Sequence, residues 1–189
     1  MKLIGLIGFK CSGKDTIADY LVENGYKKLA FADNLRSILK VMFSWDTDNF
    51  SQKEKELDDK EWGVSPRLMM QLLGTEFIRN MCSPLLNTDI EFNNKKEKFS
   101  YHIKKLYLDN INLFKNEDSK IVISDVRFPD EVKFIKLLGG DILKVNRNIK
   151  KNEFSNHESE KYIKTIKEID YEIDNNKSIK DLHKKISDL

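Results

Sequence analysis

The chain has 189 residues, and its 33 Lys and Arg nearly balance its 31 Asp and Glu. This length suits one α/β domain with a real core, and the charge balance lacks the overall basic character of nucleic-acid-binding proteins. Two cysteines, Cys11 and Cys82, do not make a disulfide framework. No stretch is apolar enough for a membrane span or a signal segment, so the cytosol is the expected compartment.

A phosphate-binding loop follows the first predicted strand, which covers residues 2–7. The loop fits the pattern G-x-x-x-x-G-K and consists of Gly8, Phe9, Lys10, Cys11, Ser12, Gly13, Lys14, Asp15 and Thr16. Its glycines let consecutive N–H groups point at a phosphate without a Cβ in the way. The helix that starts near Gly13 adds its positive end, and Lys14 supplies a charge for the β- and γ-phosphates. The sequence therefore predicts a site for a nucleoside triphosphate.

One loop position departs from the standard pattern. Asp15 stands where a Ser or Thr hydroxyl normally holds Mg²⁺, and Thr16 follows it. A carboxylate is a hard oxygen ligand for Mg²⁺, directly or through a bound water. It also places negative charge beside the phosphates, which costs free energy unless the metal or Lys14 offsets it. We expect Mg²⁺ near these two residues, and the sequence leaves open which of them binds it directly.

Strands and helices alternate along the rest of the chain. In chain order we expect a strand at 26–31, a helix at 34–43, an acidic solvated excursion at 45–64, a helix from Ser65-Pro66 to 81, a polar stretch at 87–98, a helix at 99–114, a central strand at 120–124, a helix at 130–138, a strand at 141–145, a strand at 171–174 and a last helix from Ser178 to 189. This alternation after a phosphate loop predicts a parallel sheet sandwiched by helices.

The central strand ends in Asp125-Val126-Arg127. An aspartate at the carboxyl end of a parallel strand lies at the ligand crevice, where it can hold a Mg²⁺-bound water or a substrate hydroxyl. The adjacent Arg127 can bind an acceptor phosphate through two parallel hydrogen bonds. No glutamate follows the aspartate and the chain has no N-K-x-D segment, which disfavours motors and GTPases. A structural ion pair between Asp125 and Arg127 is the alternative.

The helix expected from 65 to 81 combines an apolar surface with a polar stripe. Its apolar residues are Leu68, Met69, Met70, Leu72, Leu73, Phe77, Ile78 and Met81. Four polar residues recur at a spacing of four, namely Arg67, Gln71, Thr75 and Arg79. The apolar surface predicts a largely buried helix, whose polar stripe must then face water or a ligand, with Gly74 allowing a close approach to the backbone. An amphipathic surface helix with one exposed edge is the alternative.

Taken together, these motifs resemble the bacteriophage deoxynucleoside monophosphate kinases, a branch of the phosphate-loop kinase fold. The similar segments are 1–4 running into Lys10, 12–16, 67–76, 125–127, 157–160 and 173–178. Four of them are similar to the family patterns R-x-L-x-Q-x-x-G-T-(D/E), D-T-R, H-x-(S/T)-E and I-x-N-D-G-S. Val126 replaces the Thr of D-T-R and Lys177 replaces a turn Gly, and 46–64 and 82–100 match poorly. The segments that match poorly are expected to shape base selection.

The resemblance implies one domain over 1–189, with a helical acceptor-binding region at about 45–116 and a lid at about 147–161. It implies transfer of the γ-phosphoryl of ATP, with Mg²⁺, to a deoxynucleoside monophosphate. The implied catalytic residues are Lys14 and Arg127, and the implied metal ligands are Asp15, Thr16 and Asp125. Implied ATP contacts are the loop residues 8–16, Arg147 and Asn175, with Lys150 and Lys151 in the lid. Implied acceptor contacts are Asp33, Arg36, Arg67, Gln71, Thr75, Arg79, Asp125, Arg127, His157 and Glu158.

Two other functions remain open at this level. One is a phosphate-loop kinase with another small acceptor, similar to phosphomevalonate kinases or dephospho-coenzyme A kinases. The other is a binding module that is switched by nucleotide and catalyses no transfer. His102 and His183 are expected to be surface or packing residues. We expect ATP and a monophosphate as partners, with no nucleic acid and no membrane, in a host cytoplasm if the gene is viral, and a homodimer is left open.

Overall fold

The computed structural model describes residues 1–46, 50–92, 94–148 and 158–187. The chain forms two compact units, which we describe separately. The first unit comprises Met1–Ala30 together with Asn110–Leu189, and the second comprises Phe31–Asp109. The expected helical region at about 45–116 lies mostly within the second unit.

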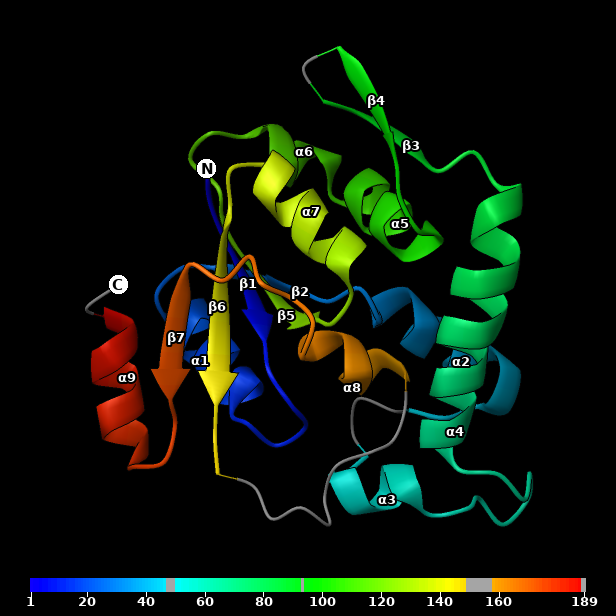
Figure 1. The fold of residues 1–189 in the computed structure, drawn as a ribbon. Coiled ribbons are helices and arrows are strands. Elements are labelled where there is room, and N and C mark those ends of the chain that lie inside the picture. The colour runs from blue at the N-terminus through cyan, green and yellow to red at the C-terminus, as the bar shows by residue number, and fades with distance from the viewer. Residues whose placement is uncertain (47–49, 93, 149–157, 188–189) are drawn as a thin grey trace. The chain divides into compact units, whose positions relative to one another are not determined.

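A parallel sheet forms the centre of the first unit (Figure 1). Its five strands lie in the order β2-β5-β1-β6-β7. Their bounds are Lys2–Ile7 for β1, Lys27–Leu29 for β2, Lys120–Val126 for β5, Asp141–Asn146 for β6 and Tyr171–Asp174 for β7. Every neighbouring pair is parallel, and β1 lies between β5 and β6. All five strands were expected from the sequence, and the β-branched run of β5 was expected to form a central buried strand.

Helices cover both faces of this sheet. They are α1 at Lys14–Glu23, α6 at Ile111–Lys115, α7 at Pro129–Leu137, α8 at Glu158–Ile163 and α9 at Ile179–Ser187. Figure 1 shows α1 and α9 on one face and α7 on the other. Buried residues of β1, β5, β6 and β7 pack against α1 and α9 in one apolar cluster. The expected α/β fold, a parallel sheet sandwiched by helices, is therefore confirmed.

The alternation of side chains along β1 explains how one strand serves both faces. Leu6 is fully buried in the cluster with α1 and α9, whereas Gly5 faces α7. A Cβ at Gly5 would lie 2.6 Å from Ile135 of α7. A larger residue at this position would therefore push α7 away from the sheet.

No helix in the described part of the chain is long and apolar enough to cross a membrane.

The second unit is mainly helical. Its helices are α2 at Asp33–Phe43, α3 at Gln52–Glu56, α4 at Pro66–Gln71, a π-helix (η1) at Leu72–Cys82, a short 3₁₀ turn (η2) at Ser83–Leu85 and α5 at Tyr101–Asp109. Its strands β3, Asp89–Phe92, and β4, Lys95–Lys98, form an antiparallel hairpin. The sequence did not predict this hairpin, because the strand Lys95–Lys98 is entirely charged and shows no apolar alternation.

The segment 45–64 is more folded than the sequence predicted. Trp45 is only 4% exposed, and its ring stacks on Phe43 with 4.4 Å between centroids. Its indole N–H donates to Asp59 Oδ2 at 3.1 Å, and Asp59 Oδ1 accepts from the backbone of Glu61 and Trp62. Among the residues from 50 to 64 whose exposure is described, none is buried. The expected solvated excursion is therefore confirmed there, and the exception is Trp45 at its start, which Asp59 holds.

The helix expected from 65 to 81 begins as predicted and then changes type. Ser65 caps α4 by accepting a hydrogen bond from the backbone N–H of Leu68 at 3.2 Å, with Pro66 in the first turn. The π-helix then runs through Cys82. Its C-cap residue is Ser83, whose hydroxyl donates to Ile78 O at 2.9 Å and accepts from Tyr101 N at 2.9 Å. π-Helical turns are rare and frequently occur at functional sites.

The surface of this helix also corrects an expectation. Its apolar residues do not form a largely buried helix, because several are about half exposed: Leu68, Leu72, Phe77 and Met81. Ile78 is buried at 8% exposure. Part of the helix's apolar surface therefore faces outward, which the prediction of a largely buried helix did not anticipate.

Asp170, the residue just before β7, links α7 to β6 through an ion pair and a backbone hydrogen bond. Lys136 Nζ lies 2.8 Å from both carboxylate oxygens of Asp170, and Ile142 N donates to Asp170 Oδ2 at 2.7 Å. Burial alone would raise the pKa of Asp170, but the hydrogen bonds from Lys136 and Ile142 and the charge of Lys136 outweigh it. The pKa of Asp170 is therefore lowered from 3.8.

We expect Asp170→Asn to reduce the loss of stability on acidification. A carboxylate with a lowered folded pKa stabilises the fold above its unfolded pKa, and this contribution disappears as the pH falls through the folded value. Urea denaturation at several pH values from neutral to about pH 3 should show wild type and variant converging below about pH 4. A difference in unfolding free energy that stayed constant over this range would contradict the prediction.

Candidate active site

The phosphate loop occupies the turn from β1 to α1 in the first unit, as predicted. Lys14 Nζ donates to Gly8 O at 2.7 Å and to Phe9 O at 2.9 Å, so the amine lies over the loop's own carbonyls. Ser12 is 1% exposed, and its hydroxyl has no hydrogen-bond partner among the described residues. A Cβ at Gly8 would lie 2.7 Å from this hydroxyl and 2.6 Å from Val145 O, which explains the glycine.

Two residues predicted to contact ATP hold the backbone of the loop. Asn175 Nδ2, after β7, donates to Ser12 O at 2.9 Å. Arg147, after β6, is exposed, and its Nη1 lies 3.4 Å from Cys11 O. Gly13 adopts φ +103°, and a Cβ there would lie 2.2 Å from Asn175 Nδ2. The carboxyl ends of β6 and β7 therefore bring Arg147 and Asn175 to the loop.

We expect Gly13→Ala to weaken ATP binding by roughly tenfold or more, because its Cβ displaces Asn175 and frees the loop carbonyl that Asn175 holds. Gly139→Ala is the matched control, since Gly139 also has a positive φ, +74°, but nothing lies within 4 Å of the added Cβ. Both variants should lose about 1–2 kcal/mol of stability from the left-handed backbone. Calorimetric titration with ATP should separate them, and equal affinities would refute a role for this tether.

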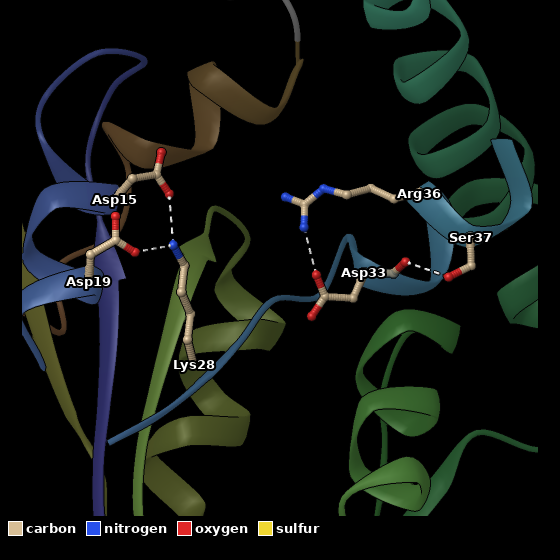
Figure 2. A network of polar contacts seen from close by, with 6 residues as sticks. All are labelled: Asp15, Asp19, Lys28, Asp33, Arg36 and Ser37. Atoms are coloured by element: carbon tan, nitrogen blue, oxygen red, sulfur yellow. Dashed lines mark hydrogen bonds and ion pairs between the residues drawn. The ribbon is translucent and has the colours of Figure 1, made fainter. Parts of the chain in front are cut away.

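Asp15 lies in an ion-paired group on α1 (Figure 2). Lys28 Nζ of β2 lies 2.9 Å from Asp19 Oδ1 and 3.6 Å from Asp15 Oδ1. The Asp15 side chain is 79% exposed, so it is open to a ligand and the lysine screens it only weakly. Among the described residues, no three His, Cys, Asp or Glu side chains converge on a ready-made metal site.

The strand-end segment lies beside the loop because of the register between β1 and β5. Ile7, the residue before Gly8, pairs with Val126. Asp125 and Arg127, on either side of Val126, are partly buried. This pairing therefore places Asp125 and Arg127 at the carboxyl edge of the sheet, next to the phosphate loop, as predicted.

Sequence reasoning missed Glu131, which holds this segment from α7. It is 3% exposed, and its Oε2 accepts hydrogen bonds from Arg127 N at 2.8 Å and Phe128 N at 3.1 Å. The available signal was a glutamate three residues after the helix N-cap, with Pro129 in the first turn. It was weak, because the usual Ser or Thr of a capping box is replaced by Phe128.

In the second unit, two of the predicted acceptor arginines have carboxylate partners. Arg36 Nη1 donates to Asp33 Oδ1 at 2.6 Å (Figure 2), so the two acceptor candidates of α2 bind each other. Arg67 Nε donates to Glu56 Oε1 of α3 at 3.2 Å. Glu56 was not among the predicted residues, because nothing in its charged segment distinguishes it from its neighbours. Side chains of both pairs are partly exposed.

The rest of the polar stripe differs in exposure, with Gln71 at the end of α4 and with Thr75 and Arg79 on the π-helix. Gln71 and Arg79 are partly buried, and Thr75 is 7% exposed. The wider π-helical turn keeps residues four and five apart on one face. The close approach expected at Gly74 is made by Leu35 of α2, which lies 2.8 Å from where a Cβ would be. The Gly74 carbonyl accepts a hydrogen bond from His102 Nε2 at 2.9 Å.

Some of the predicted site residues lie outside the described part of the chain or have few described contacts. Lys150, Lys151 and His157 lie outside the described residues, and so does most of the predicted lid at 147–161. Glu158 begins α8. His183 packs as predicted, since its ring stacks on Tyr20 with 4.2 Å between centroids, and the buried His102 packs within the second unit.

The sequence matches the model of a known family, deoxynucleotide monophosphate kinase, over residues 44–186. A protein of Acanthamoeba polyphaga mimivirus whose name places it in the same kinase family is 36% identical, over 98% of this chain and 94% of the relative. A dephospho-CoA kinase of Fusobacterium nucleatum is 26% identical over 97% of this chain and 94% of its own length. The structure of a dephospho-CoA kinase from Campylobacter jejuni covers all of this chain and 95% of its own with a TM-score of 0.53, at 16% identity, which shows a shared fold.

Proposed function

This chain belongs to the deoxynucleotide monophosphate kinase family and is a phosphotransferase with the phosphate-loop kinase fold, and we propose that it transfers the γ-phosphoryl of ATP to a deoxynucleoside monophosphate. A phosphate oxygen of the monophosphate attacks the γ-phosphorus, and the bond to the β–γ bridging oxygen breaks. The products are ADP and a deoxynucleoside diphosphate. The phosphate loop after β1, with its glycines and buried Ser12, carries this proposal.

The first unit supplies the groups that would bind the donor. Lys14 would exchange the carbonyls of Gly8 and Phe9 for β- and γ-phosphate oxygens, because a phosphate offers a stronger, charge-assisted hydrogen bond. Asn175 and Arg147 contact the carbonyls of Ser12 and Cys11, which helps to fix the backbone of the loop. Arg127 would neutralise charge on the transferring group and on the attacking phosphate.

Hard oxygen donors at the loop fit a magnesium ion carried in by ATP. Asp15 and Thr16 would hold it on the α1 side, and Asp125 on the β5 side, directly or through water. The exposed Asp15 carboxylate can exchange its 3.6 Å pairing with Lys28 for a stronger ligand. The ion would supply neutralisation of the β- and γ-phosphate charge.

The second unit supplies groups suited to the acceptor. Arg36, Arg67 and Arg79 are cations that fit a monophosphate, and Gln71 and Thr75 offer hydrogen bonds to a sugar or base. Asp33 and Glu56 hold two of the arginines in place before substrate binds. A dianionic phosphate would compete with these carboxylates for the same guanidinium groups.

The acceptor is tested by measuring ADP release with dTMP, dGMP, dCMP, dAMP and dephospho-coenzyme A, each with ATP and Mg²⁺. We expect at least one deoxynucleoside monophosphate to give a far higher rate than dephospho-coenzyme A. The second acceptor is included because the Fusobacterium nucleatum relative is a dephospho-CoA kinase. Transfer only to dephospho-coenzyme A would replace the proposed substrate, and no transfer to any acceptor would refute the proposed function.

A further inference from the structure

The N-terminus of α7 contains a buried glutamate. Glu131 is the third residue of this nine-residue helix, and its carboxylate is buried at 3% exposure. A buried carboxylate is costly unless charge-assisted hydrogen bonds and a positive environment offset the loss of water. Here one oxygen accepts from two consecutive backbone N–H groups, and the positive end of α7 adds to them.

Both N–H groups belong to the segment that carries Arg127. On one side, Val126 is fully buried and pairs with Ile7 of β1. On the other side, Phe128 is 9% exposed, and its ring lies 5.4 Å from that of Tyr162. Glu131 binds the backbone of Arg127 itself and of the next residue. The backbone from which the arginine side chain departs is therefore fixed at three successive residues.

We propose that Glu131 is a positioning residue that fixes the backbone of Arg127, so that its guanidinium meets the phosphate oxygens during transfer. This inference rests on the proposed function, because it assumes that Arg127 acts on a phosphate. A small shift of the strand end moves the tip of an arginine much further than its backbone, and misplacement by about 1 Å can cost roughly a hundredfold in rate. Glu131 would act through the backbone of Arg127, because its side chain is buried and its Oε2 accepts from backbone N–H groups.

A helix cap with no effect on transfer is the competing explanation, and α9 provides a matched control. Asp181 occupies the same third position of its helix, where its Oδ2 accepts from Ser178 N at 3.2 Å and from Ser178 Oγ at 2.6 Å. Both carboxylates therefore cap a helix of the first unit. Only Glu131 binds the backbone of a proposed catalytic residue, so only its loss should affect transfer.

The test compares Glu131→Ala, Glu131→Gln and Asp181→Ala with wild type. The acceptor is whichever monophosphate the wild-type enzyme uses best. We expect Glu131→Ala to lower kcat for transfer at least tenfold, with KM for ATP within about twofold of wild type, because the phosphate loop is untouched. Glu131→Gln keeps an acceptor oxygen and should recover most of the lost kcat. Asp181→Ala should lose thermal stability and keep wild-type kcat.

A second readout follows the backbone directly. Amide hydrogen exchange at Arg127 and Phe128 should speed up in Glu131→Ala, much less in Glu131→Gln, and not in Asp181→Ala. Faster exchange with unchanged kcat would show a cap only and overturn the inference. If Glu131→Ala does not fold, Glu131→Gln is the test: a loss of kcat that accompanies faster exchange at these amides supports the inference, whereas a tenfold loss of kcat with these amides still protected refutes it. A wild-type enzyme that phosphorylates no acceptor refutes the proposed function first, and this inference with it.

Discussion

Lys14→Ala should lower turnover by roughly a hundredfold or more while the protein stays folded. The reason is that charge develops on the transferring phosphoryl group, and this ammonium is the cation that the phosphate loop places there. Its present partners, the carbonyls of Gly8 and Phe9, lie in the loop itself at 2.7 and 2.9 Å. The measurement is steady-state kcat with ATP and the best acceptor.

Lys27→Ala is a suitable control for this substitution. Lys27 is an exposed lysine of the same unit at the amino end of β2, away from the carboxyl edge of the sheet where the loop lies. It should keep wild-type kcat, and both variants should unfold at similar temperatures. Near-wild-type turnover of Lys14→Ala would show that this loop does not bind the transferred phosphate.

ATP hydrolysis without an acceptor should proceed at less than about a hundredth of the rate of transfer to a good deoxynucleoside monophosphate. The strand end has Val126 and Arg127 after Asp125, and no glutamate that could polarise a water. Catalysis then depends on a phosphate oxygen of the acceptor, which Arg127 would help to bind. Fast ADP release in the absence of acceptor would contradict the kinase mechanism.

Arg127→Ala separates the two reactions within one protein. Losing a charge-assisted phosphate contact costs about 1.5–3 kcal/mol, so transfer should fall by roughly one to two orders of magnitude. The slow background hydrolysis should stay almost unchanged, and it serves as the internal control for folding and ATP binding. An equal loss in both reactions would assign Arg127 to the donor phosphates or to the fold.

The predictable part of this protein lies in contiguous segments. The phosphate loop is nine consecutive residues whose chemistry depends mainly on backbone angles and on one lysine. β1 and β5 are short apolar runs, and their order along the chain, with a helix after each, restricts a parallel sheet to few topologies. The capping of α4 by Ser65 is equally local. The fold, and the place of the phosphate loop between β1 and α1, could therefore be predicted without coordinates.

The sequence was less informative where a residue's role depends on distant partners. Asn175 holds Ser12 across 163 positions of the chain, and Lys28 reaches Asp15 from the next strand. Trp45 is buried and binds Asp59, within a segment that is otherwise exposed or partly exposed over its described residues. In the π-helix, the close approach expected at Gly74 is made by Leu35, and the Gly74 carbonyl accepts a hydrogen bond from His102, partners that the sequence did not identify.

The sequence by itself determined that this chain has a phosphate loop on a parallel sheet and an Asp–Arg strand end, because those features are set by local backbone chemistry and apolar pattern. Only the tertiary structure decided what holds them. Glu131 fixes the backbone of Arg127, Asn175 and Arg147 hold the loop, and Glu56 orients Arg67. The physical reason is that a polar side chain's role follows from the partner that folding brings within hydrogen-bond distance, and residue type alone does not specify that partner.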